Sequence, residues 1–122
     1  MPRVQVRFFR ESDGSVPLVE WLARLSDRAE MKCHVKLERL AELGHEIRRP
    51  EADFLQHGIY ELRATLQGIH YRMLYFFVDR WAVIVSHGIV KEDRVPQREI
   101  DLAILRKALV EQNPMRHTAE HL

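Results

Sequence analysis

Two arginines stand out because they lie in apolar sequence that is otherwise typical of β-strands. In the stretch IYELRATLQGIHYR, residues 59–72, Arg63 precedes a Gln67-Gly68 turn and Arg72 follows it. A guanidinium group carries a planar set of N–H donors that can hold a phosphate or a carboxylate by two parallel hydrogen bonds. Two such groups could share one anion if their side chains point in the same direction.

The turn decides where these arginines point. A two-residue hairpin loop at Gln67-Gly68 places Arg63 directly opposite Arg72, and directly opposite residues share one face of a sheet. Like charges in that position oppose strand pairing by up to ~1 kcal/mol. Either a bound anion relieves the repulsion, or a carboxylate such as Glu61 neutralises the arginines.

A histidine on the following strand extends the arrangement. If the next hairpin also has a two-residue loop, at residues 79–80, His87 lies opposite Arg72. The sequence then predicts a row of Arg63, Arg72 and His87 in which the imidazole could move a proton beside a bound phosphate. The alternative is that His87 only caps the end of its strand, and a shift of one residue would scatter the row.

A second group of basic residues lies on a helix, where Lys32, Lys36 and Arg39 form a charged side. These residues are candidates for contact with RNA, and the alternative is a solvated helix face. Cys33 has no partner for an internal disulfide, and we expect a buried or unreactive thiol. The seven histidines lack the spacing of a metalloprotease helix. We therefore expect no metal site from them.

Length and composition suit one ordinary globular domain. The chain has 122 residues, of which 46% are hydrophobic and 30% charged, and its formal net charge is +1. Such a balance does not by itself indicate nucleic-acid binding, so any basic patch must be local. We expect one domain over residues 1–112 and a flexible tail over 113–122. No apolar run approaches the ~18 residues of a membrane span and the N-terminus lacks a signal-peptide core, so we expect a cytoplasmic location.

The elements that must position these residues follow from hydrophobic periodicity and turn signals. Residues 45–57 are expected to form an irregular connection. Met31, Val35, Leu37, Leu40 and Ala41 are expected to form the buried side of the second helix. The predicted strands cover residues 4–9, 59–66, 69–78 and 81–90, and the predicted helices cover residues 18–25, 28–43 and a segment that begins near Pro96. This order predicts an α+β fold in which helices flank one antiparallel sheet.

Four segments resemble the RelE/HigB family of bacterial toxins, in its phage-derived HigB-like branch. GIYELR, YRMLYFF, VSHGIVK and VPQREIDLA occur in the order and at the spacing of that branch, between about Gly58 and Ala103. VEWLARL and LERLAELG match the same family more loosely. The resemblance implies a RelE-like antiparallel sheet with N-terminal helices and a C-terminal helix.

The resemblance also implies a function. Such a toxin is an endoribonuclease, or mRNA interferase, that uses no metal and no cofactor. It cuts mRNA at the ribosome and is neutralised by a HigA-like helix-turn-helix antitoxin. Arg72 and Arg63 would stabilise the phosphate, His87 and Lys91 would transfer protons or contact it, and Arg94 would bind RNA. Tyr75 lies on the opposite face from Arg72 and would serve in packing.

Three positions depart from the family pattern, and two other functions remain open. Glu92 replaces a usual second lysine, Val95 a usual helix-capping threonine, and Ile89 a usual phenylalanine. The alternatives are a non-enzymatic inhibitor of DNA gyrase, as in the related ParE-like toxins, and a degenerate toxin that only binds its antitoxin.

Overall fold

The computed structural model describes residues 3–90 and 93–120, and its centre is a six-stranded sheet. The strands lie in the order β2-β3-β4-β5-β1-β6. The pair β1–β5 is parallel, and the other pairs are antiparallel. The bounds are β1 Gln5–Phe9, β2 Ala52–Gln56, β3 Ile59–Leu66, β4 Ile69–Phe77, β5 Ala82–Val90 and β6 Thr118–Glu120.

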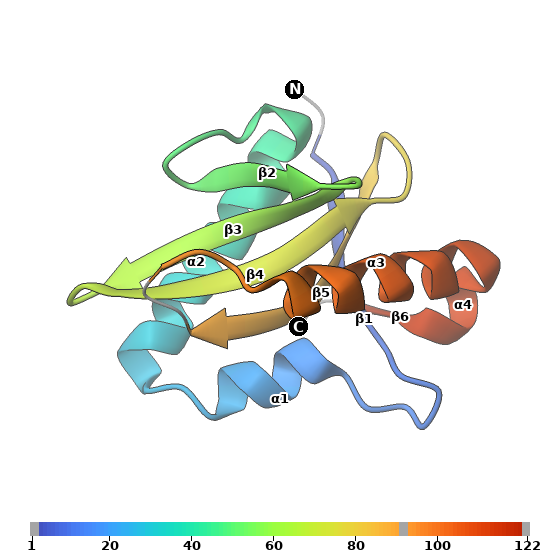
Figure 1. Ribbon diagram of the computed structural model, residues 1–122, viewed down its shortest axis with the longest axis horizontal. Helices are drawn as coiled ribbons and strands as arrows, with labels where there is room; N and C mark the ends of the chain where they lie inside the picture. Colours follow the sequence, from blue (N-terminus) through green and yellow to red (C-terminus); the bar gives the residue numbers. More distant parts are fainter. Residues whose placement is uncertain (1–2, 91–92, 121–122) are drawn as a thin grey trace.

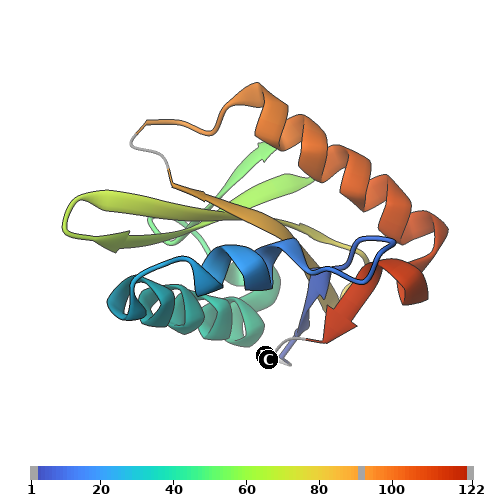
Figure 2. The same ribbon diagram turned by 90° about the horizontal axis from the view of Figure 1, so that it is seen from below.

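Helices cover both faces of the sheet. α1 (Pro17–Ala23) and α2 (Asp27–Leu43) lie on one face, and α3 (Gln97–Gln112) crosses the other (Figures 1 and 2). A short 3₁₀ turn, Gly44–Glu46, follows α2, and a short helix α4, Pro114–His117, follows α3. The α+β class with N-terminal helices and a C-terminal helix is therefore confirmed.

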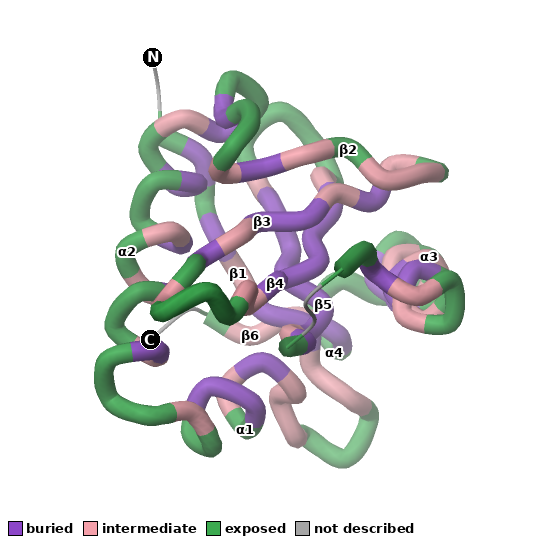
Figure 3. Tube along the Cα trace, turned by 60° about the vertical axis from the view of Figure 1, so that its left-hand side comes forward, coloured by how far each residue is buried: buried purple, intermediate pink, exposed green. Residues whose placement is uncertain are grey.

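The sheet separates two apolar cores. Strand side chains alternate between faces, so neighbouring residues of β4 enter different cores: Tyr75 packs beneath α1 and α2, whereas Leu74 and Phe76 pack beneath α3. The central strands are correspondingly buried, while the β3–β4 turn is exposed (Figure 3). Burial raises the pKa of Tyr75 well above its usual range, and the predicted packing role of this residue is confirmed.

α2 begins and ends as the sequence predicts, but its buried side is narrower. Ser26 accepts a hydrogen bond from the backbone N–H of Ala29 at 3.2 Å, which satisfies one free donor of the first turn. The buried residues include Leu37, Leu40, Ala41 and Cys33, whose thiol was expected to be buried. Met31 and Val35 are 69% and 54% exposed, so their assignment to the core is wrong. The sheet covers only one stripe of the helix.

Two further expectations need correction. Residues 45–57 are not an irregular connection, because they contain the 3₁₀ turn and the edge strand β2, which pairs with β3. Where a frayed tail is expected from residue 113, Asn113 caps α4 by accepting from the backbone N–H of Arg116, and β6 pairs with β1. Both strands lie at sheet edges and are rich in polar residues, so their sequences lack the alternating pattern of a half-buried strand.

No helix in residues 3–90 and 93–120 has the length and apolar character needed to cross a membrane.

Candidate functional site

Arg63 and Arg72 lie directly opposite each other on β3 and β4, as the hairpin arithmetic predicts. The turn between the strands has the two residues expected, with Gln67 at φ 53° and Gly68 at φ 81°. Both positive φ values belong to the type of tight turn that fits the twist of a hairpin. The two arginines therefore extend from the same face of the sheet, the face that α3 partly covers.

Glu61 lies between the two arginines and bonds to both. Its Oε1 accepts from Arg63 Nη2 at 2.5 Å, and its Oε2 lies 3.5 Å from Arg72 Nη1. Glu61 is 2% exposed and Arg72 is 6% exposed, so this ion pair is largely removed from water. The neutralising carboxylate that the sequence left as an alternative is present, but one carboxylate cannot balance two guanidinium groups.

The arginines retain unused hydrogen-bonding capacity. The Nε atoms of Arg63 and Arg72 are buried and have no hydrogen-bond partner within the described part of the chain. A buried donor without a partner costs roughly 1–3 kcal/mol, so such groups are rare in folded proteins. Two of them beside an uncompensated positive charge indicate a site that an anion would complete.

A cavity of about 610 Å³ opens beside this cluster. Its walls come from β2, β3, β4 and the segment that leads into α3, which brings the exposed Arg94 to the same space. Val95 is buried in the core beneath α3, so it anchors that segment although it cannot cap the helix. The lining comprises Asp53, Phe54, Leu55, Gln56, Glu61, Arg63, Arg72, Arg94, Val95, Pro96, Gln97 and Ile100.

His87 lies on the same face as the arginines but not opposite Arg72. Its partner across β4 is Leu74, and Arg72 pairs with Ile89. The predicted Arg72–His87 pairing is therefore wrong, because the β4–β5 loop is longer than two residues and Ser86 forms a bulge in β5. His87 is buried beneath α3 and does not line the arginine cavity.

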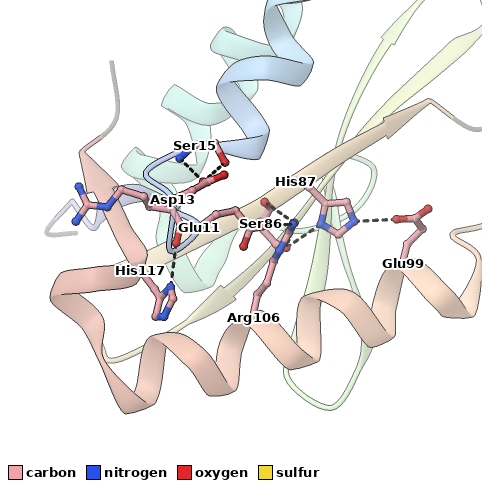
Figure 4. A network of polar contacts seen from close by, with 9 residues as sticks. Glu11, Asp13, Ser15, Ser86, His87, Glu99, Arg106 and His117 are labelled. Atoms are coloured by element: carbon pink, nitrogen blue, oxygen red, sulfur yellow. Dashed lines mark hydrogen bonds and ion pairs between the residues drawn. The ribbon is translucent and has the colours of Figure 1, made fainter.

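The ring of His87 belongs to a polar network that joins β5 to α3 (Figure 4). Nε2 lies 3.0 Å from Glu99 Oε1, and Nδ1 lies 2.7 Å from Ser86 Oγ. Arg106 Nη1 donates to the carbonyl oxygen and Oγ of Ser86, and Arg106 Nη2 lies 3.3 Å from Glu11 Oε2. The Arg106 guanidinium also packs on the ring of Phe9, with 4.9 Å between its carbon and the ring centroid.

The environment of His87 favours the neutral imidazole. Burial lowers its pKa and the nearby Arg106 guanidinium lowers it further, while the hydrogen bond to Glu99 acts in the opposite direction. An ionised Glu99 can only accept, so Nε2–H donates to Glu99 and Nδ1 accepts from the Ser86 hydroxyl. Both ring nitrogens are thus engaged within the protein.

A comparison with protein families identifies the family to which this chain belongs. The profile of the family described as Phage derived protein Gp49-like (DUF891) matches residues 20–108. The chain belongs to the Gp49-like family. This family is of the RelE-like toxin–antitoxin type. A search of curated proteins found no match to this sequence.

The Gp49-like match covers the whole arginine cluster and the His87 network apart from Glu11. The other predicted residues are placed differently. Lys36 and Arg39 both pair with Glu51, at 3.0 and 2.8 Å. The pKa of Glu51 is lowered to about 2, mainly by its hydrogen bond from Arg39. Lys32 is exposed on α2. None of these three basic residues lines the arginine cavity, and their predicted contact with RNA stays a prediction.

Lys91, a predicted site residue, and the neighbouring Glu92 lie outside the described residues.

Within residues 3–90 and 93–120, no group of three or more histidine, cysteine, aspartate and glutamate side chains could hold a metal ion. Cys33 is fully buried, and burial raises the pKa of its thiol to about 12, so the thiol stays protonated at neutral pH.

Sequence reasoning missed the contribution of β2 to the cavity. Asp53, Phe54 and Gln56 line it, and Gln56 exchanges side-chain hydrogen bonds with Gln97 at the start of α3. The signal for β2 is weak because a bulge between Phe54 and Gln56 breaks its alternation. The aromatic Phe54 in a polar stretch is the one residue that could have indicated a strand.

Proposed function

We propose that this Gp49-like protein is the toxin component of a type II toxin–antitoxin system, and that it cleaves mRNA as a metal-independent endoribonuclease. One observation carries the proposal: Arg63 and Arg72 are paired on rigid strands and face a cavity that Arg94 also lines, and their buried Nε donors have no partner among residues 3–90 and 93–120. This combination suits a phosphodiester, which carries negative charge and several acceptor oxygens.

The charge balance supports a phosphate as the ligand. Glu61 compensates one of the two guanidinium groups, which leaves one positive charge at the cluster and a further one on Arg94. Asp53 also lines the cavity, but its carboxylate is paired with Arg49 at 2.9 Å. Oriented donors fixed on strands need little reorganisation when negative charge develops on the phosphorus centre, and stabilisation of this kind is worth roughly 10²- to 10³-fold in rate per donor. Arg72 is the more buried arginine and is our first choice for this role.

The proposed reaction uses the RNA as its own nucleophile. The 2′-oxygen attacks the adjacent phosphorus, the bond from phosphorus to the 5′-oxygen breaks, and a 2′,3′-cyclic phosphate and a 5′-hydroxyl form. The 2′-OH must lose a proton and the leaving oxygen must gain one. Glu61, whose carboxylate lies between the two arginines, is the group proposed to accept the proton of the 2′-OH. Lys91 or solvent supplies the proton to the leaving oxygen.

His87 is better placed to position the site than to transfer protons directly. Its contact with Glu99 fixes the first turn of α3 against β5, and that turn follows the segment carrying Arg94 and Val95. Loss of the contact would loosen one wall of the cavity. The direct proton-transfer role predicted from the sequence remains the competing proposal for this residue.

The ribosome is the proposed place of action. At a net charge of +1, the protein gains little from the release of counterions that drives general RNA binding. A ribosome would present the mRNA at high local concentration and so remove the need for strong binding. The proposed partner is a HigA-like antitoxin that covers the arginine cavity or blocks entry to the ribosome.

The decisive experiment maps the ends of cut RNA. Purified protein is incubated with mRNA, with and without ribosomes and with and without chelator. The proposal expects cyclic-phosphate and 5′-hydroxyl ends in every reaction that cuts RNA, and in the reactions without ribosomes it expects no effect of chelator, since ribosomes themselves need Mg²⁺. A metal requirement in the absence of ribosomes, or 5′-phosphate ends in any reaction, would overturn the mechanism. Growth arrest by a protein that cuts no RNA under any of these conditions would favour the non-enzymatic gyrase inhibitor.

A further inference from the structure

A ladder of aromatic rings lies on the other face of the sheet from the arginines, beside the edge strand β2. Phe54 contacts Tyr60 edge to face at 5.2 Å between centroids, and Tyr60 stacks on Tyr75 at 5.3 Å. His45 stacks on Phe77 at 3.7 Å, and Phe77 meets Tyr60 edge to face. The inner rings of this ladder are held by the core, so its outer end is a rigid apolar surface.

The outer end of the ladder faces a second cavity of about 500 Å³. Phe54 is 53% exposed, so much of its side chain is open to a ligand. Arg48 and Arg49 also line this cavity, and both are exposed. Arg49 pairs with Asp53 at 2.9 Å, and Arg48 Nη1 donates to the carbonyl oxygens of His45 and Ile47, which leaves further guanidinium donors on each side chain. Exposed aromatic rings between arginines form the kind of surface on which unpaired nucleic-acid bases stack.

The second cavity adjoins the arginine cavity at the edge of the sheet. Asp53 and Phe54 line both spaces. Successive side chains of a strand point to opposite faces. Asp53 therefore lies opposite Glu61 on the arginine face, and Phe54 lies opposite Tyr60 on the other face. Since β2 is the edge strand, a polynucleotide can pass from one cavity to the other without meeting another strand.

We propose that the Phe54–Tyr60 ladder is a subsite for an unpaired base of the same RNA strand whose phosphate occupies the arginine cavity. The base stacks on the exposed ring of Phe54, and Arg48 and Arg49 contact the flanking phosphates. The inference rests on the proposed function and adds to it that the substrate is single-stranded at this position, because a base held in a duplex cannot reach the ring. The subsite adds affinity that depends on bases and little on their sequence.

The test compares two oligonucleotides that the protein cannot cut. Both carry 2′-O-methyl groups in place of the nucleophilic 2′-OH; one is an octamer of adenosine, and the other has the same backbone without bases. Dissociation constants are measured at one fixed salt concentration. Stacking of a single base is worth roughly 5- to 150-fold in affinity, so wild type is expected to prefer the base-bearing octamer by that factor.

Variants assign this preference to a residue. Phe54→Leu keeps an apolar side chain and should lose the preference while its affinity for the abasic octamer is unchanged. Phe54→Trp should keep the preference and show quenching of the new tryptophan by the base-bearing octamer. Arg72→Ala should weaken the binding of both octamers equally. Circular dichroism of Phe54→Leu checks that the fold is intact.

Each other outcome overturns the inference. Equal binding of the two octamers by wild type, binding of neither, or a preference that survives in Phe54→Leu would each show that the ladder holds no base. If Phe54→Leu instead loses binding of the antitoxin alone, the surface docks a protein. If RNA cleavage depends on Arg72 but Phe54→Leu keeps the preference for bases, the subsite is wrong and the proposed function stands. If Phe54 binds a base but the protein cuts no RNA, the subsite stands and the proposed function is wrong.

Discussion

Arg63 and Arg72 are paired across two central strands although both carry a positive charge. Like charges in directly opposite positions destabilise a sheet, and the partner that offsets this effect, Glu61, is buried beneath them. Their two Nε donors stay unpartnered within residues 3–90 and 93–120. The pairing thus has a cost in stability that an anion in the adjacent cavity would offset.

The first prediction concerns Arg72. Arg72→Ala should lower RNA cleavage by roughly 10²- to 10³-fold and relieve growth arrest. Arg72→Lys should also impair cleavage, because an ammonium group cannot reproduce a bidentate contact with phosphate. Cleavage rates and growth curves measure these effects.

The fold should survive Arg72→Ala, since Glu61 keeps its bond to Arg63. Arg28→Ala is the matched control, because Arg28 is an exposed arginine near the start of α2 and its loss should leave cleavage unchanged. Full toxicity of a folded Arg72→Ala protein would remove Arg72 from the site.

The second prediction concerns the carboxylate that separates the arginines. Glu61→Gln keeps the size of the side chain but leaves two guanidinium groups without a counter-charge, so the free energy of unfolding should fall by roughly 3–5 kcal/mol. Inorganic phosphate should raise the melting temperature of this variant more than that of wild type, since it replaces the lost negative charge. Cleavage should fall as well if Glu61 accepts the 2′-OH proton.

The experiment is a thermal melt with increasing phosphate, and chloride at equal ionic strength is the control. Equal shifts for Glu61→Gln and wild type would show that the cluster does not bind the anion.

His87 and Gly88, which are adjacent in the VSHGIVK segment, illustrate what could be predicted from the sequence and what could not. The resemblance drew attention to His87, but Gly88 is explained only by the structure, because the ring of Trp21 lies against its Cα. A methyl group at Gly88 would lie 2.3 Å from two atoms of that ring. The contact joins α1 to β5, which are distant in sequence, so no local pattern could reveal it.

The third prediction follows from this close approach. Gly88→Ala should reduce the free energy of unfolding by roughly 1–3 kcal/mol, because the added methyl group overfills a packed core. Trp21→Phe removes part of the indole and should recover some of that loss in the double variant. Urea denaturation of the four proteins measures the coupling. Additive effects of the two substitutions would contradict the contact.

The strand register shows both the strength and the limit of sequence reasoning. The β3–β4 hairpin was predicted correctly because its two-residue turn fixes every pair that follows. For β4–β5 the sequence predicted a pairing of Val78 with Trp81, whereas Phe77 pairs with Val83. This change moves the register by one residue, and the bulge at Ser86 moves it by one more. The two shifts sum to two, so His87 keeps the predicted face but lies opposite Leu74.

The remaining features of the site depend on tertiary contacts. The segment with Arg94 reaches the cavity because Val95 is buried beneath α3, and β2 closes the cavity although a bulge breaks its alternation. Neither element has a local pattern strong enough to predict its position. The cluster of Arg63, Arg72 and Glu61 was accessible from the sequence because all three lie in one hairpin.

The last prediction concerns His87 and pH. Its pKa is lowered in the folded protein, chiefly by burial and then by Arg106, whereas in the unfolded chain it should be near 6.5. Between these two values the unfolded chain binds more protons, so the stability due to neutral His87 is fully present above pH ~6.5 and is lost as the pH falls below it. His87→Gln retains hydrogen-bonding groups and cannot titrate. Wild type should therefore lose more stability than His87→Gln between pH 7 and pH 5 in urea denaturation.

The same variant separates the two roles proposed for His87. If His87 positions α3 through Glu99, His87→Gln should lower the rate of cleavage modestly without changing its pH profile, and Glu99→Gln should have a similar effect because it weakens the same contact. If His87 instead transfers a proton, His87→Gln should lose roughly 10²- to 10⁴-fold in rate at unchanged RNA affinity, and the limb of the profile that imidazole titration causes should disappear. A large loss in His87→Gln with no loss in Glu99→Gln would contradict the positioning role and restore His87 to the reacting groups.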